Sequence, residues 1–175
     1  MKRVQLFLIL FLTGIVVLAQ NTTEDKNTIP FVDIKDVKGN PYNTMNISND
    51  GKPIILSFWA TWCKPCIKEL SAIADVYDDW REETGVVIYA VSIDDARSSN
   101  QVGPYVNGKG WEYQVLLDPN GDFKRAMNVN LIPQTFIIDG KGEIVWQHTS
   151  FAEGNELELI KLIRKLNAGE SIDEK

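Results

Sequence analysis

The sequence predicts an α/β domain in which helices flank a mixed central sheet. Continuous apolar segments at residues 54–59 and 86–93 have the length and composition of buried strands. Segments 65–80 and 153–166 carry apolar residues three and four positions apart, as amphipathic helices do. Strands alternate with helices before a final hairpin and helix, which predicts helices packed on a sheet.

Turn residues separate the individual elements. The segments Lys38–Pro41 and Asp139–Gly142 contain glycine, and the first also contains proline, which favours chain reversal. The predicted strands cover residues 31–37, 42–47, 54–59, 86–93, 113–117, 134–139 and 143–148. The predicted helices cover residues 65–80, 94–107, 122–128 and 153–166. In the last helix, the apolar face is predicted to consist of Leu157, Ile160, Leu162, Ile163 and Leu166.

The first 19 residues have the layout of a secretory signal. Lys2 and Arg3 form a basic start, residues 4–18 are largely apolar, and a cleavage site is expected before Gln20. The alternative is an uncleaved membrane anchor, for which the apolar stretch is short. We therefore expect an exported protein of the periplasm or its equivalent. Its predicted parts are a signal peptide at 1–19, a flexible leader at 20–28, a folded domain at 29–168 and a tail at 169–175.

Length and charge limit the partners. The chain has 175 residues, of which 18 are lysine or arginine and 24 are aspartate or glutamate, for a net charge of -6. Loss of residues 1–19 removes two of the basic residues and leaves 156 residues with a net charge of -8. This length suits one domain. The sequence has no basic cluster, which argues against a nucleic-acid partner, and we expect a soluble exported monomer.

Cys63 and Cys66 are the only cysteines in the sequence, and two residues separate them. Cys63 follows the predicted strand 54–59, and Cys66 lies where the next helix is expected to begin, with Pro65 in its first turn. Two sulfurs at this spacing can close a small disulfide ring and reopen it. A disulfide across such a short loop removes little entropy from the unfolded chain, so a structural staple is the weaker alternative. The pair therefore predicts redox chemistry.

Two motifs resemble those of the thioredoxin fold. The run Phe58–Cys66, which ends in Trp-Cys-Lys-Pro-Cys, resembles the active-site motif, and Ile132–Asp139 resembles the segment that carries the cis-proline. Added sequence between residues 86–93 and Pro133 is similar to the insertion in the periplasmic TlpA/ResA branch of thiol-disulfide oxidoreductases. The resemblance covers residues 31–166. It implies a thioredoxin-like fold with an N-terminal strand extension and a central helix-strand insertion.

The sequence can be compared with the patterns of these families at a few positions, some of which differ. Ser57 stands where thioredoxin proper has a buried acidic residue in the strand before the motif. Glu69 occupies the position of a glutamate that is common in the TlpA/ResA branch. Ser71 replaces a proline that often follows this glutamate, so the usual kink in the helix is expected to be missing. The Pro-x-x-x-Thr-x-x-Cys pattern of peroxiredoxins is absent.

The predicted helix start gives the two thiols different roles. Unpaired backbone N–H groups and the helix dipole stabilise a thiolate at Cys63, which is therefore the predicted nucleophile. Cys66 lies one turn further in, is expected to be more buried, and is the predicted resolving thiol. Glu69 follows three residues later on the same helix face. Its position and the resemblance together predict that it takes the proton of Cys66, whereas a solvated carboxylate is the alternative.

The resemblance also implies where a substrate binds. A cis bond between Ile132 and Pro133 would place this turn against Cys63, and the backbone of Ile132 would pair with a substrate strand. Trp62 is expected to belong to an exposed apolar rim, whereas Trp59 belongs to the core. The predicted substrate-binding residues are Trp62, Lys64, Pro65, Ile132 and Pro133.

The predicted function is reduction of disulfides in extracytoplasmic proteins. Lys64-Pro65 ends in proline, as in reducing thioredoxins, and no histidine lies between the cysteines; net oxidation or isomerisation is the alternative. A copper-binding chaperone that uses both cysteines and His148 is a different class, and a binding domain with an inert disulfide is another. No cofactor is expected. The expected partners are a disulfide-containing protein, with apocytochrome c as one candidate by resemblance, and an upstream thiol donor, with a membrane protein as one candidate.

Overall fold

The computed structural model describes residues 27–172, which form one mixed sheet with helices on both of its faces. The strands are β1 (Asp33–Asp36), β2 (Pro41–Asn43), β3 (Ile54–Trp59), β4 (Val87–Ser92), β5 (Gln114–Leu117), β6 (Gln134–Ile138) and β7 (Ile144–Thr149). The α-helices are α1 (Lys64–Ala74), α2 (Tyr77–Thr84), α3 (Val102–Lys109), α4 (Asp122–Ala126) and α5 (Asn155–Asn167). The predicted signal segment, most of the predicted leader and the last three residues of the predicted tail lie outside the described residues.

The sheet has the strand order β2-β1-β5-β4-β3-β6-β7. β3, β4 and β5 are parallel, whereas β6 runs antiparallel to β3 and continues into β7 as a hairpin. All six residues of β3 are buried, because neighbouring strands flank it on both sides and helices or loops cover both faces of the sheet. This explains why its sequence is a continuous apolar run rather than an alternating one.

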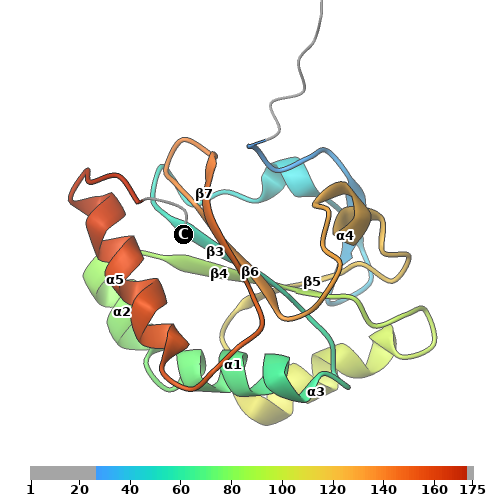
Figure 1. The fold of residues 1–175 in the computed structure, drawn as a ribbon. Coiled ribbons are helices and arrows are strands. Elements are labelled where there is room, and N and C mark those ends of the chain that lie inside the picture. The colour runs from blue at the N-terminus through green and yellow to red at the C-terminus, as the bar shows by residue number, and fades with distance from the viewer. Residues whose placement is uncertain (1–26, 173–175) are drawn as a thin grey trace, which may run out of the picture.

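Two hydrophobic cores hold the helices on the sheet. Helices α1, α2, α3 and α5 lie on one face, and the short α4 lies on the other, as Figure 1 shows. β1 and β2 form the N-terminal extension, and α3 with β5 forms the central insertion. The predicted fold class is therefore confirmed. Within residues 27–172, no helix is both long enough and apolar enough to span a membrane.

The predicted helix 65–80 is wrong in one respect, because the structure contains two helices there. α1 ends at Ala74, and Val76 adopts a non-helical backbone conformation before α2 begins at Tyr77. The apolar spacing continues across this break: Ile73, Tyr77 and Trp80 are all buried in the same core. Hydrophobic periodicity alone therefore could not reveal the break. Ser71 lies within α1, which continues past it without interruption, as expected.

Side-chain hydrogen bonds to the backbone shorten two other predicted elements. The predicted strand 42–47 becomes a 3-10 turn after Asn43, because the side chain of Asn43 accepts a hydrogen bond from the N–H of Met45. The predicted helix 94–107 begins only at Val102, after a 3-10 turn at Ser99–Gln101. Upstream of it, the Asp95 carboxylate accepts hydrogen bonds from backbone N–H groups and forms a turn instead.

The last helix is shifted slightly from its predicted position and presents a different face. α5 covers Asn155–Asn167, and Leu157 is exposed, contrary to the prediction. Leu159 is buried in its place, together with Ile160 and Ile163. Both leucines fit a helical period, so the prediction selected the wrong one of two overlapping apolar stripes.

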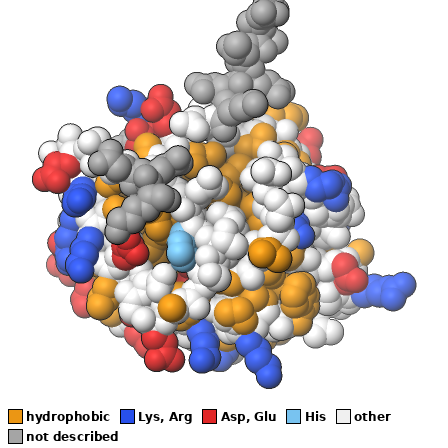
Figure 2. Space-filling view, in the orientation of Figure 1, with side chains coloured by type: hydrophobic (Ala, Val, Ile, Leu, Met, Phe, Trp, Pro, Cys, Tyr) orange, Lys and Arg blue, Asp and Glu red, His pale blue; other side chains and the backbone are white. Residues whose placement is uncertain are grey.

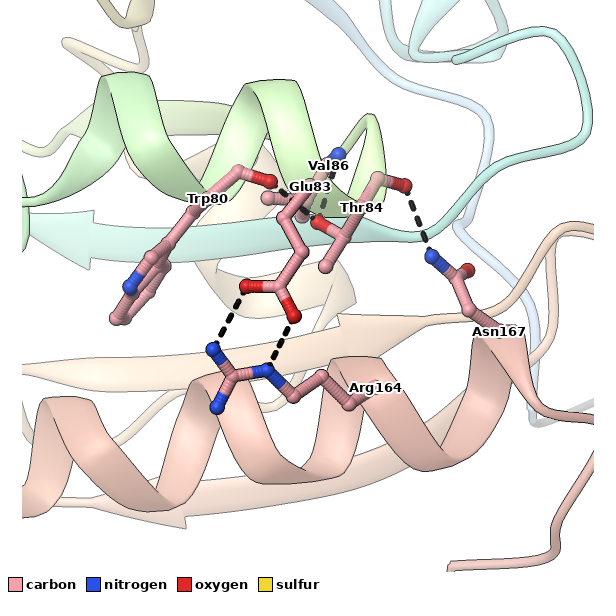
Figure 3. Close-up of polar contacts among 6 residues, drawn as sticks. All are labelled: Trp80, Glu83, Thr84, Val86, Arg164 and Asn167. Atoms are coloured by element: carbon pink, nitrogen blue, oxygen red, sulfur yellow. Dashed lines mark hydrogen bonds and ion pairs between the residues drawn. The ribbon is translucent and has the colours of Figure 1, made fainter.

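Polar contacts connect the ends of α2 and α5, as Figure 3 shows. Thr84 is buried, and its hydroxyl donates to the carbonyl of Trp80 at 2.7 Å and accepts from the N–H of Val86 at 3.2 Å. Asn167 donates to the carbonyl of Thr84 at 2.9 Å. On the outside, Arg164 forms two hydrogen bonds with the Glu83 carboxylate. The buried hydrogen bonds fix the backbone where α2 ends and the chain enters β4.

We expect Thr84→Val to lower the free energy of unfolding by about 1–3 kcal/mol, because it leaves the buried N–H of Val86 without an acceptor. Denaturant unfolding measures this change. Glu83→Gln is the matched control, since it weakens only an exposed ion pair that salt screens. A larger loss for Glu83→Gln than for Thr84→Val would contradict this interpretation.

Candidate active site

The two cysteines lie where the chain passes from β3 into α1. Cys63 is the N-cap residue of α1, Cys66 lies in the first turn, and the two form a disulfide. The sulfur of Cys63 accepts a hydrogen bond from the N–H of Cys66 at 3.3 Å, so a helix N-terminal donor points at it. Cys66 is fully buried and Cys63 nearly so. Lys64 and Pro65 are exposed between them, and Pro65 occupies the first turn, where no N–H is needed.

The loop before β6 lies at the same edge of the sheet. The peptide bond between Ile132 and Pro133 is cis. Phe58 pairs with Gln134 in the antiparallel β3-β6 ladder, so the chain leaves β3 toward Cys63 at the edge where the Pro133 segment enters β6. Ile132 packs against the core that contains both cysteines. Among the described residues, no hydrogen-bond partner occurs for the backbone groups of Ile132, so this short segment can still pair.

Glu69 is a buried carboxyl on the helix face below the disulfide. Its side chain is 4% exposed. Thr135 donates a hydrogen bond to Oε1 at 2.8 Å, and Ser57 donates to Oε2 at 3.4 Å. Burial raises the pKa of Glu69 to about 7, and the two hydrogen bonds oppose this rise without cancelling it. A carboxyl with this pKa can gain or lose a proton near neutral pH, as a general base must.

A second buried carboxylate anchors the loop that leads to Cys63. Asp94 has no exposed surface, and it accepts hydrogen bonds from the N–H of Thr61 at 2.9 Å and from its hydroxyl at 2.6 Å. The hydroxyl of Ser92 donates to the same carboxylate at 2.8 Å. These bonds fix the chain two residues before Cys63. The predicted helix 94–107 placed Asp94 at its first position and therefore misses the role of this carboxylate as a buried anchor.

The two tryptophans of the motif lie in different environments, as predicted. Trp59 has no exposed surface and packs edge-on against Trp111, whereas Trp62 is 65% exposed beside Cys63. Leu131, two residues before Pro133, is 70% exposed. Exposed large apolar side chains on both motif loops are typical of a surface that meets another molecule.

The structure thus brings together most of the residues that the sequence singled out. Cys66 and Glu69 lie on α1, Cys63 caps the start of this helix, and Ile132 packs against the cluster that contains both cysteines. Sequence reasoning missed Thr135 as a partner of Glu69. The only signal for Thr135 in the sequence was its position two residues after Pro133, on the strand that follows the proline.

The copper alternative required His148 to join the two cysteines. His148 instead stacks on Trp146 in β7, and its ring lies 3.3 Å from the side-chain nitrogen of Asn155. Within residues 27–172, no three His, Cys, Asp or Glu side chains are grouped so that they could hold a metal ion.

These features define a thioredoxin-like protein with a Cys-x-x-Cys disulfide and an adjacent cis-proline. The chain belongs to the AhpC/TSA family, whose model matches residues 26–147.

Relatives and solved structures agree with this assignment. The thiol-disulfide oxidoreductase ResA of Geobacillus kaustophilus is 31% identical over 118 residues, which are 67% of this chain and 65% of that protein. An uncharacterized thioredoxin-like protein from Porphyromonas gingivalis is 55% identical, with a TM-score of 0.72 over 80% of this chain and 92% of that one. StoA of Bacillus subtilis is 25% identical, with a TM-score of 0.58 over 77% of this chain and 98% of that one.

These relatives confirm the predicted resemblance to the TlpA/ResA branch. The chain spans about half to two thirds of the length of the first curated relatives, with 65% and 52% of two ResA proteins covered.

The raised pKa of Glu69 predicts a specific dependence of stability on pH. The folded-state pKa of about 7 lies above the unfolded value near 4.5, so the folded oxidised protein binds the extra proton between these values. The contribution of Glu69 to the free energy of unfolding is fully present below pH 4.5 and is lost as the pH rises toward 7. The loss is about 3 kcal/mol, on the order of 1.4 kcal/mol per pKa unit.

Chemical unfolding of the oxidised protein at several pH values measures this loss. Glu69→Gln keeps the shape of the side chain and removes the titration, so its stability should change less over the same range. Equal slopes for the two proteins between pH 4.5 and 7 would refute the assignment of the proton to Glu69.

Proposed function

We propose that this protein is an exported thiol-disulfide oxidoreductase that reduces disulfides in extracytoplasmic proteins through Cys63 and Cys66. One observation carries the proposal: a disulfide at the N-terminus of α1 lies on the same helix as a buried carboxyl whose pKa is raised to about 7. The relatives named thiol-disulfide oxidoreductase support this chemistry. The basic and apolar sequence of residues 1–19 supports export.

The proposed cycle begins with the reduced protein. The Cys63 thiolate, stabilised by the start of α1, attacks a sulfur of the substrate disulfide and forms a mixed disulfide, and the first substrate thiol leaves. Glu69 then accepts the proton of Cys66. The Cys66 thiolate attacks the Cys63 sulfur, the Cys63–Cys66 disulfide forms, and the second substrate thiol leaves. Two electrons pass to the substrate, and an upstream thiol donor must return them.

The remaining predicted residues act in substrate binding. One side of the site consists of the exposed residues Trp62, Lys64 and Pro65. The other side consists of Ile132 and Pro133. The backbone of Ile132 pairs with an extended substrate segment. The pair Lys64-Pro65, without histidine, supports the reductive direction. We propose that the protein acts as a monomer without a cofactor and that apocytochrome c is a candidate substrate, which would place it in cytochrome c biogenesis.

Trapping of mixed disulfides tests the activity. Cys66→Ala should accumulate adducts through Cys63 with extracytoplasmic proteins, because the resolving thiol is missing. Cys63→Ser is the matched control and should accumulate none. An equal yield of adducts from the two variants would refute the roles of the two cysteines. A reduction potential near that of strongly oxidising proteins, about −120 mV, would overturn the reductive direction.

The role of Glu69 predicts a change in the resolving step. Glu69→Gln should slow release of substrate from a preformed mixed disulfide by about 100-fold or more at pH 7, as loss of a general base does. Stopped-flow fluorescence measures this release. Thr135→Val is the second variant: it removes a hydrogen bond that lowers the pKa of Glu69, so the pH midpoint of release should move upward. An unchanged rate and midpoint in both variants would exclude this role.

A further inference from the structure

The outer edge of β7 is open over most of its length. Within the described part of the chain, β7 is the last strand of the sheet and pairs with β6 alone. The N–H of Ser150 donates to the carbonyl of Pro133 at 2.8 Å and so faces β6. Because backbone groups alternate in direction along a strand, the N–H groups of Gln147 and Thr149 face away from β6. Among residues 27–172, neither of these two groups has a hydrogen-bond partner.

The start of the described chain already pairs with the other end of this edge. Thr28 forms an antiparallel bridge with Glu143, and the N–H of Ile144 donates to the carbonyl of Asn27 at 2.6 Å. Figure 1 shows the described chain beginning beside the β6-β7 hairpin. Because the bridge is antiparallel, a chain that continues this pairing before Asn27 runs along β7 toward Thr149.

The segment that precedes Asn27 has the length and composition for this edge. Ile144 and Thr149 are five residues apart, about 17 Å at a rise of about 3.3 Å per residue, so residues 22–26 reach the end of β7. This segment contains neither proline nor glycine, and its first two residues are threonine, which favours strands. Its last three residues are charged, as is common in outermost strands, where charge discourages pairing with a further chain.

The surface around β7 does not oppose this pairing by charge. Charged side chains lie mainly at the margin of the view in Figure 2, whereas the middle, where β6 and β7 run in Figure 1, is mostly uncharged. A segment that carries both signs of charge therefore meets no strong repulsion there.

We propose that residues 22–26 form an eighth strand on the outer edge of β7, antiparallel to it, rather than the flexible leader predicted from the sequence. The occupant of the edge is thus this chain's own N-terminal segment, and its pairing does not depend on the proposed function. The strand closes the row of backbone groups that Gln147 and Thr149 leave open, and it continues a ladder that Asn27 and Thr28 begin.

The proposed strand determines where the N-terminal chain leaves the domain. Thr149 is directly opposite Gln134, which follows Pro133, so β7 ends at the edge of the sheet that carries the disulfide. The chain before residue 22 therefore emerges at this edge, and a chain cleaved before Gln20 has its amino terminus there. An uncleaved anchor holds the disulfide close to the membrane surface, within reach of a membrane-bound thiol donor.

Two proline variants test the pairing. Asn27 faces β7, so in a continued strand Asp25 also faces β7, whereas Glu24 faces solvent. Asp25→Pro therefore removes an N–H group that the proposal directs at β7, and Glu24→Pro removes one that it directs at solvent. Each variant replaces one carboxylate with one proline, so the two have the same charge and are matched controls for each other.

The measured quantity is the hydrogen-exchange rate of single backbone amides, followed by NMR on the protein as the cell exports and processes it. In the unmodified protein and in Glu24→Pro, the amides of Gln147 and Thr149 should be protected at every protein concentration. In Asp25→Pro they should exchange at least about fivefold faster, because a hydrogen bond of the outer pairing is lost. The amide of Ser150, which faces β6, should exchange equally in all three proteins.

Three results would overturn the proposal. The first is unprotected exchange of Gln147 and Thr149 in the unmodified protein, and the second is an equal effect of the two proline variants. The third is protection that disappears on dilution, because a second copy of the chain would then cover the edge. Trapping of mixed disulfides measures the proposed reductase activity separately, so either proposal can fail while the other stands.

Discussion

The pairing of Ser57 with Thr135 across β3 and β6 is the contact on which this site depends. The two residues are directly opposite in the antiparallel ladder, and both hydroxyls donate to Glu69, which approaches from α1. The same register places Phe58 opposite Gln134 and so brings the disulfide loop and the cis-proline loop to one edge. A slip of one residue would turn Thr135 to the other face and leave the buried carboxyl with one donor fewer.

Two buried carboxyl groups near the disulfide have different roles. Asp94 accepts three hydrogen bonds, one of them from a backbone N–H, and holds the loop before Cys63 in place. Glu69 accepts two hydrogen bonds, both from hydroxyls, and burial is the largest influence on its pKa. A well-satisfied carboxylate is a structural anchor, whereas a poorly satisfied one is suited to exchange a proton.

The parts of this arrangement that the sequence predicted are those that depend on short-range spacing. Cys63, Cys66 and Glu69 lie within seven residues at the start of one helix, so local spacing alone relates them. The partnership of Glu69 with Thr135, 66 residues away, depends on the register of two strands, which no local pattern fixes. The same holds for Asp94 and Thr61, 33 residues apart. The break at Val76 escaped prediction for a different reason: the apolar spacing is the same on both sides of it.

The position of the acidic group has a consequence for how the site is built. Thioredoxin proper carries its buried acid on the strand, where this chain has Ser57, and here the acid is Glu69 on the helix. Because Glu69 and Cys66 share α1, the helix alone sets their separation, one turn apart on one face. The sheet contributes the hydroxyls that adjust the pKa of Glu69. Substitutions in β3 or β6 can therefore change when the proton moves without changing the distance over which it moves.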